Sequence, residues 1–486
     1  MRSALRATAV LSSGSVVQIG VALIVSKVWA VLVGPAGVGL FGLLQSLIGI
    51  GTIVASLGVG MGMVRLGAQA LGSGDERRAA ALHRAALAIA WTAGALACVG
   101  IAVFRRPVAA AMLGGPEQSL GAALAGAGIL CTVVSGVMTN VLNAHRRVRA
   151  LATALALSSV LGAAVNVALI LRFREAGIPW AVAAATAVVL VVNAAFLHRE
   201  VRYSADARPD RATRRRALRD LVSFGLPQMG SSLVGAGVML ALPLLVLHEL
   251  DLDSVGFYRA SLTVAAGYLG FLFTAMGQDY YPRLAAIGAS PADVSRAVND
   301  QIRLVLLVVG PLVLLAQAAA FVLVPLVYAA SFAPAIPVLE WMMTGSLFRF
   351  FAWALAFVVL ARNTSLAYFA VEAVGGAATL AMTWAGLRAF GLVGSGIGFF
   401  AAYVLYAAFV WVLVRRRVGV TVSPGNRRML AGFAVASLSV HGAVAAGAPA
   451  AARALALVLG TAAAAYSARV LLPLLIGPRQ AAAPSS

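Results

Sequence analysis

The stretch 21-VALIVSKVWAVLVGPAGVGLFG-42 indicates the fold, because it is apolar on both sides of a Gly-Pro turn and carries a single charge, Lys27. The first run extends back to about residue 9 and the second forward to about residue 63. A helix crosses the roughly 30 Å core of a bilayer with about 20 apolar residues. The stretch therefore predicts two membrane spans joined by a tight turn.

Similar apolar runs recur along all 486 residues. Apolar residues make up 62% of the chain, charged residues 11%, and the mean hydropathy is +0.95. A soluble protein would carry roughly a quarter charged residues. The sequence predicts an all-α polytopic membrane protein with fourteen spans: 9–33, 36–63, 85–104, 119–142, 151–172, 177–198, 223–247, 257–281, 303–329, 335–361, 364–387, 391–414, 428–447 and 451–476.

The net charge of +21 follows the predicted topology rather than a nucleic-acid patch. If the N-terminus is cytoplasmic, 28 arginines fall at the cytoplasmic side and six at the outer side. This is the positive-inside pattern, and it predicts that both termini are cytoplasmic. Lys27, Arg259 and Arg349 belong to no loop.

A polar segment at 201–222 divides the chain. We expect an N-terminal six-helix lobe at 1–200, this cytoplasmic linker, a C-terminal six-helix lobe at 223–417, and an additional two-helix segment at 418–486. A weak repeat supports two lobes of the same orientation, since 37-GVGLFGLLQSL-47 is similar to 254-SVGFYRASLTV-264. Parallel repeats occur in transporters that open alternately, but chance similarity in Gly- and Ala-rich sequence is the alternative.

Charged groups inside a membrane are costly and mark candidate sites. Arg349 lies roughly fourteen residues, or about 21 Å, into its span. Gly345 and Ala356 share its face and would leave room for a ligand, and Trp353 offers a flat surface there. A structural ion pair is the alternative role.

Lys27 and Arg259 lie closer to the ends of their spans. For both, extension of the side chain to the membrane surface competes with a place in a cavity. Glu372 lies within a span and Asp279 near a span end. Either acid could carry a coupling proton, bind Na⁺, or neutralise a cation, and the sequence leaves these roles open.

Enzymatic constellations are not evident. The sequence contains no Cys/His metal spacing, phosphate-binding loop or nucleophile elbow, and its five histidines are scattered. We expect no catalytic residues, no metal and no cofactor.

Five stretches carry a resemblance to a known family: 26-SKVWAVLVGPAGVGLFG-42, 255-VGFYRASLTVAAGYLGFLFTAMGQDYYPRLA-285, 338-VLEWMMTGSLFRFFAWALAFVVLAR-362, 368-YFAVEAV-374 and 401-AAYVLYAAFVWVLVRRR-417. They resemble the Wzx-type flippases for O-antigen and enterobacterial common antigen, which belong to the multidrug/oligosaccharidyl-lipid/polysaccharide (MOP) superfamily. The resemblance covers about residues 1–417.

The resemblance implies two six-helix lobes around a central cavity, in a bacterial inner membrane. It implies translocation of an undecaprenyl-diphosphate-linked oligosaccharide to the outer leaflet, with other polysaccharide-assembly membrane proteins as partners. The family's cations fall on Lys27 and Arg349 and its glutamate on Glu372, whereas a polar residue is expected at Arg259. An acid expected beside Gly345 is replaced by Ser346, so coupling to H⁺ or Na⁺ stays open.

Three other functions remain as alternatives. A peptidoglycan-precursor flippase shares the lipid diphosphate and has fourteen helices. A drug or cation antiporter of the same superfamily predicts an acidic cavity, whereas the deep charges here are more basic than acidic. A non-transporting membrane scaffold predicts that neutralising Arg349 affects only assembly.

Overall fold

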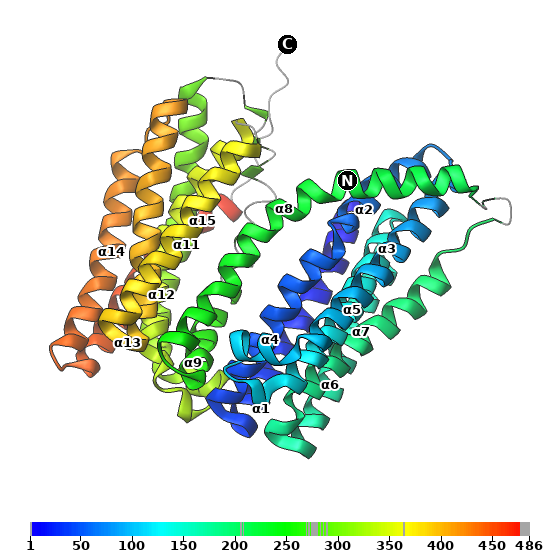
Figure 1. Ribbon diagram of the computed structural model, residues 1–486. Helices are drawn as coiled ribbons and strands as arrows, with labels where there is room; N and C mark the ends of the chain where they lie inside the picture. Colours follow the sequence, from blue (N-terminus) through cyan, green and yellow to red (C-terminus); the bar gives the residue numbers. More distant parts are fainter. Residues whose placement is uncertain are drawn as a thin grey trace, which may run out of the picture. The chain divides into compact units, whose positions relative to one another are not determined.

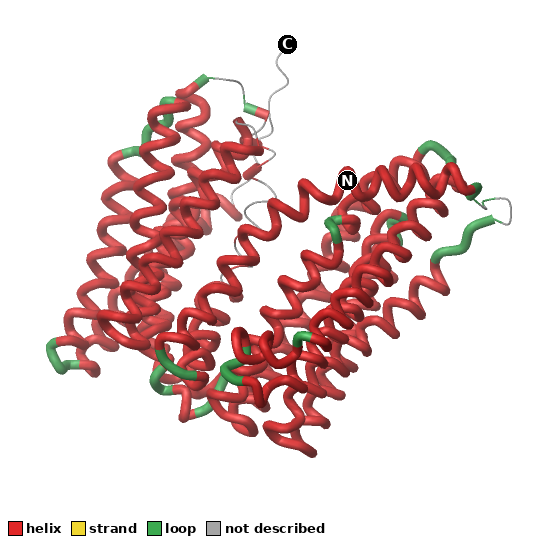
Figure 2. Tube along the Cα trace, viewed as in Figure 1, coloured by secondary structure: helices red, strands yellow, loops and turns green. Residues whose placement is uncertain are grey.

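The computed structural model confirms an all-α membrane protein (Figures 1 and 2). It describes residues 2–476 apart from Ala205, Asp206, Arg208, Leu269, Phe271, Leu272, 274–279, Pro282, Ala285, Gly288, Ala289, Asn363 and Thr364. Side chains are described from Gly20 onward, apart from those of Ser231, Ala266, Tyr268, Arg362, 365–368 and 474–476. Within these residues ten helical ranges are long and apolar enough to cross a membrane. The ranges Gly20–Ser56, Val148–Glu200 and Phe369–Val418 each contain two predicted spans. Together the ten account for every predicted span except 257–281, part of which lies outside the described residues.

The chain forms two compact units. Unit 1 is Met1–Arg259 with Pro325–Phe332, and unit 2 is Ala260–Val324 with Ala333–Ser486. The helices of unit 1 are α1 (Arg2–Ser56), α2 (Val59–Gly72), α3 (Glu76–Val103), α4 (Arg105–Met112), η1 (Pro116–Gln118), α5 (Ser119–Ala144), α6 (Val148–Phe173), η2 (Arg174–Gly177), α7 (Ile178–Glu200), α8 (Arg211–Glu249) and η4 (Ala330–Phe332). Helix α9 (Leu252–Leu262) begins in this unit and continues into unit 2.

Among its described residues, unit 2 contains the π-helical stretch η3 (Thr263–Tyr268) and five long helices. These are α11 (Pro291–Val327), α12 (Ala335–Arg362), α13 (Ser365–Val418), α14 (Pro424–Ala445) and α15 (Pro449–Ile476). Helix α11 passes into unit 1 after Val324. Helices α1 and α13 each consist of two spans joined at a glycine, Gly34 (φ 63°) in α1 and Gly391 (φ 58°) in α13. These positive φ angles break the helix where the sequence predicts turns.

A close approach of α8 to the start of α2 depends on two further glycines. Gly58 has φ 66°, and a Cβ added there would lie 2.1 Å from the Gly225 carbonyl oxygen. A Cβ on Gly225 would lie 2.2 Å from the carbonyl oxygen of Leu57. The two backbones therefore touch directly, and neither position has room for a side chain.

Two segments that connect predicted spans contain helix. The segment 105–118, between the predicted spans 85–104 and 119–142, includes α4 and η1. About half of the predicted linker 201–222 is the beginning of α8, which starts at Arg211. Asp210 caps α8 by accepting a hydrogen bond from the Thr213 N–H. Earlier in the linker, the Tyr203 ring packs against His83 and His145. Burial raises the pKa of the Tyr203 phenol above its usual range, so this group stays neutral.

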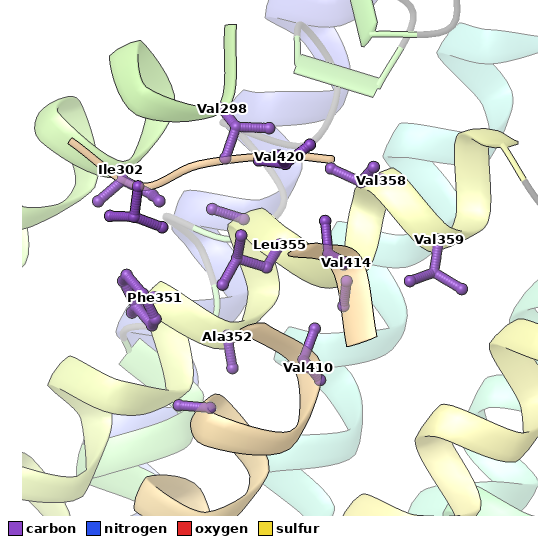
Figure 3. Close-up of a cluster of buried hydrophobic side chains, with 14 of the residues drawn as sticks. Val298, Ile302, Phe351, Ala352, Leu355, Val358, Val359, Val410, Val414 and Val420 are labelled. Carbon is purple, nitrogen blue, oxygen red and sulfur yellow. The ribbon is translucent and has the colours of Figure 1, made fainter. Parts of the chain in front are cut away.

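One cluster of buried apolar side chains in unit 2 includes residues of the first half of α11, of α12 and of the end of α13 (Figure 3). Figure 3 shows Val298 and Ile302 of α11 in this cluster, together with labelled residues of α12 and α13. Phe351 and Leu355 are at most 3% exposed. In a membrane the lipid chains are as apolar as these side chains, so there is little hydrophobic driving force for the helices to associate. Close van der Waals packing therefore stabilises this contact.

Helix α14 is joined to α11 and α12 by buried polar side chains. Gln317 Nε2 donates to Thr344 Oγ1 at 3.2 Å and lies 3.3 Å from His441 Nε2, while Ser437 donates to Gln317 Oε1 at 3.1 Å. Thr344 Oγ1 also lies 2.9 Å from His441 Nε2, and the Trp341 ring stacks on His441 with 3.9 Å between centroids. Because an amide nitrogen only donates, His441 Nε2 accepts from Gln317. The first of the two additional helices is thus an integral part of unit 2.

Replacing Gln317 by leucine should loosen α14. The change leaves the buried Ser437 and the partly buried His441 with fewer partners, at a cost of about 1–3 kcal/mol. We expect a lower unfolding temperature in detergent and faster hydrogen exchange in α14. Thr461→Val is the matched control, because that exposed hydroxyl bonds only to carbonyls of its own helix. Equal melting of the two variants would contradict the prediction.

Candidate functional site

Arg349 lies in α12 between two aromatic rings of unit 2. Its guanidinium carbon is 4.9 Å from the centre of the Phe273 ring and 5.8 Å from that of Tyr403. Its Nη1 is buried and makes no hydrogen bond within the described residues. Over the same residues it has no ion pair. Ring faces attract a cation by about 0.5–2 kcal/mol but accept none of the five N–H bonds that a guanidinium can donate.

The surroundings of Arg349 differ in part from those expected on its own helix face. Trp353 packs against Phe273 with 5.0 Å between ring centres, so it lies one ring beyond the guanidinium. The space beside Gly345 is filled, since a Cβ there would lie 2.7 Å from the Phe399 ring. The rings that contact Arg349, Phe273 and Tyr403, are on other helices. Only the i, i+3 pair of tyrosines in 401-AAYVLYAAF-409 could have indicated them from sequence.

Glu372 is connected to Arg349 through two tyrosines. The Tyr406 hydroxyl donates to Glu372 Oε1 at 2.9 Å, and the Tyr406 ring meets Tyr403 edge-on at 6.3 Å. Glu372 forms no ion pair within the part of the chain that is described. The structure therefore brings Arg349 and Glu372 into one polar series, Arg349–Tyr403–Tyr406–Glu372, without neutralising either charge. Asp279 lies outside the described residues.

Lys27 is bonded to backbone rather than to an acid. Its Nζ donates to the Pro325 carbonyl oxygen at 2.7 Å. Pro325 is in the last turn of α11, where carbonyls have no partner within the helix and the dipole favours a cation. Lys27 thus caps α11 at the point where this helix enters unit 1. At the end of the same segment, Phe332 packs against Phe257 with ring centres 5.8 Å apart.

Arg259 makes a similar connection at the other chain crossing. It is the last residue of unit 1 in α9, and its Nη2 donates to the Gly42 carbonyl and the Ser46 hydroxyl of α1. Gly42 leaves the space that the guanidinium occupies. Lys27 and Arg259 therefore each bond α1 to a segment at which the chain changes from one unit to the other. Spacing along one helix cannot indicate such a contact.

Loss of the Lys27 ammonium should loosen the end of α11. In Lys27→Met the Pro325 carbonyl has no charged donor, which costs about 1–2 kcal/mol in a partly buried place. We expect faster hydrogen exchange at the backbone amides of 326–332, with near-normal exchange in Lys27→Arg. Unchanged exchange in Lys27→Met would show that the contact does not hold this segment.

The fold and the family are both defined by comparison with known proteins. A multidrug resistance MATE-family transporter of the MOP superfamily, in an inward-facing conformation, superimposes with a TM-score of 0.65 at 17% identity, over 83% of this chain and 98% of that one. The lipid II flippase MurJ, in an inward closed conformation, gives a TM-score of 0.64 at 10% identity, over 95% and 99% of the two chains. The fold is therefore that of MOP-superfamily transporters.

The similarity extends to a MOP transporter from Pyrococcus furiosus, described as having a binding pocket of reverse polarity, with a TM-score of 0.55 at 18% identity over 85% and 95% of the chains. No curated protein matches the sequence significantly. The profile of a family described as "Polysaccharide biosynthesis protein" matches residues 28–337, more than half of the chain. The chain belongs to this polysaccharide biosynthesis protein family.

Proposed function

We propose that the protein is a flippase for an undecaprenyl-diphosphate-linked oligosaccharide. It would act in a bacterial inner membrane with both termini in the cytoplasm. Membership of a polysaccharide biosynthesis family and the fold of MOP transporters support this class. The observation that supports this substrate is Arg349, a partly buried arginine whose buried Nη1 makes no hydrogen bond within the described residues.

The chemistry of the substrate fits this cation. A diphosphate carries about two negative charges, and hydrocarbon excludes it unless the charges are compensated. Arginine binds phosphate oxygens through two parallel N–H bonds, and the Phe273 and Tyr403 rings keep the guanidinium plane in place without competing for its donors. The partly exposed rings of Trp353 and Tyr403 would offer contacts for sugars. No covalent bond is broken during the movement.

Translocation would follow from alternate opening of the two lobes, with the prenyl chain remaining in lipid. Glu372, bonded to a tyrosine rather than to a cation, is available to bind H⁺ or Na⁺. Asp279 is proposed from sequence for the same task. Lys27 and Arg259 would serve the diphosphate only after leaving their carbonyl partners, so Arg349 is the main contact in this proposal.

A lipid II-type flippase is the second candidate, because the similarity to MurJ includes 95% of the chain. Deleting the gene tests both functions. The main proposal expects lipid-linked oligosaccharide to accumulate at the cytoplasmic side and surface polysaccharide to be lost. Accumulation of peptidoglycan precursor instead would favour the second candidate. Normal levels of both lipids and of surface polysaccharide would exclude a flippase role and leave the scaffold or antiporter alternatives.

A further inference from the structure

A groove of about 680 Å³ lies on unit 1 between α5, α6, η2 and α7. Half of its ten lining residues are alanines, and Phe173 and Trp180 are the largest. On α7, positions 180, 183, 184 and 187 lie on one face, since side chains three and four apart are neighbours on a helix. The small Ala183, Ala184 and Ala187 therefore leave a hollow beside Trp180. Its volume lies in the range of small-molecule sites, about 300–1,000 Å³.

The lining of the groove is apolar and therefore suits a hydrocarbon chain. None of its lining residues is a carboxylate, an amide or a basic side chain. None belongs to the polar series around Arg349, which is in unit 2, and neither Lys27 nor Arg259 lines it. The groove is thus separate from the residues proposed for the diphosphate.

One end of the groove is cationic. Phe173 lines it and is 51% exposed, and the Arg172 guanidinium carbon lies 5.4 Å from the centre of the Phe173 ring. Arg174 follows at the start of η2, and both arginines are exposed. The neighbouring acid, Glu175, lines a different hollow together with Gly37 and Pro179. Guanidinium groups pair with phosphate oxygens through charge-assisted hydrogen bonds.

We propose that this groove holds an acyl chain of a resident anionic phospholipid, with the lipid phosphate at Arg172 and Arg174. The apolar hollow and the cations at its end match the two parts of such a lipid. Trp180, which is 50% exposed, lies at the same end of the groove as the polar head would, as expected of tryptophan at a membrane interface. The site is independent of the substrate that the protein carries.

Photo-crosslinking tests the proposal on the full-length protein in nanodiscs. Two diazirine-acyl lipids, phosphatidylglycerol and phosphatidylcholine, are compared, and adducts are mapped by peptide mass spectrometry. We expect several-fold more adducts from phosphatidylglycerol on peptides of α5 and α7 that line the groove, reduced by unlabelled phosphatidylglycerol. In Arg172→Gln/Arg174→Gln this excess should disappear. The control Arg105→Gln/Arg106→Gln changes two other exposed arginines of unit 1 and should retain it.

A second variant fills the hollow. Ala184→Trp should lower adducts from both lipids in the groove, whereas Ala95→Trp on an exposed position of α3 should not. Equal labelling by the two lipids in the unaltered protein would overturn the proposal. So would competition by undecaprenyl diphosphate without competition by phosphatidylglycerol, which would assign the groove to the prenyl chain of the substrate.

Discussion

Replacing Arg349 by alanine is expected to reduce transport of the lipid-linked saccharide by about 10- to 150-fold. Hydrogen bonds to charged groups contribute about 1.5–3 kcal/mol, and each 1.4 kcal/mol is a factor of ten in rate or affinity. Arg349→Lys should recover part of this loss, because an ammonium keeps the charge but cannot make two parallel bonds. The rate is measured with a fluorescent prenyl-diphosphate saccharide in proteoliposomes.

The thermal stability of Arg349 variants distinguishes a substrate-binding role of this residue from a structural one. Removing one member of a buried ion pair costs about 3–5 kcal/mol, because the other charge is left uncompensated. Arg349 has no such partner among the described residues, so Arg349→Met should unfold at the same temperature or a higher one. Arg388→Met is the control. Arg388 is an exposed arginine of unit 2, and its guanidinium carbon lies 4.7 Å from the centre of the Trp384 ring. Normal transport in Arg349→Ala, or a marked loss of stability in Arg349→Met, would contradict the site.

The largest effect on folding is expected at the crossing of Gly58 and Gly225. Gly58→Ala places a methyl group 2.1 Å from the Gly225 carbonyl and imposes a left-handed backbone on alanine. The backbone costs about 1–2 kcal/mol and the overlap about 1–3 kcal/mol more. Gly225→Ala meets the Leu57 carbonyl and should be similarly harmful. The yield of monodisperse protein and its melting temperature measure both effects.

Gly49→Ala provides the comparison for that prediction. Gly49 is in α1, the helix that ends shortly before Gly58. A Cβ added at Gly49 would have no neighbour within 4 Å. Alanine is the better helix former, so this variant should fold as well as the unaltered chain. If Gly58→Ala and Gly49→Ala gave the same yield and melting temperature, the close approach of α2 and α8 would not limit folding.

The spans could be predicted from sequence because hydropathy is local. Each needs only a run of apolar residues. The turn at Gly34 lies between two predicted spans, and the turn at Gly391 lies at the first residue of the predicted span 391–414. Helix α4 in the connection 105–118 was not predicted, since it is too short and too polar to give a membrane signal. The boundaries of the two lobes stay predictions.

The contacts of the charged residues could not be predicted in the same way. Arg349 was selected for its depth in a span, but the two rings that contact it come from other helices, which a single span does not reveal. Glu372 bonds to Tyr406, beyond the turn at Gly391. Lys27 and Arg259 find their partners 298 and 217 residues away. Assigning residues to the faces of a helix from their spacing identifies neighbours on that helix only. It does not identify backbone carbonyls as partners.

The bond from Lys27 to the Pro325 carbonyl has a genetic consequence. A backbone acceptor is the same whichever residue occupies its position, so the partner of Lys27 cannot be removed or improved by changing its side chain. Second-site suppressors of Lys27→Met should therefore be absent at position 325, and statistical covariation between positions 27 and 325 should be weak. Reversion should come from a new basic residue that reaches the same carbonyl from elsewhere on α1.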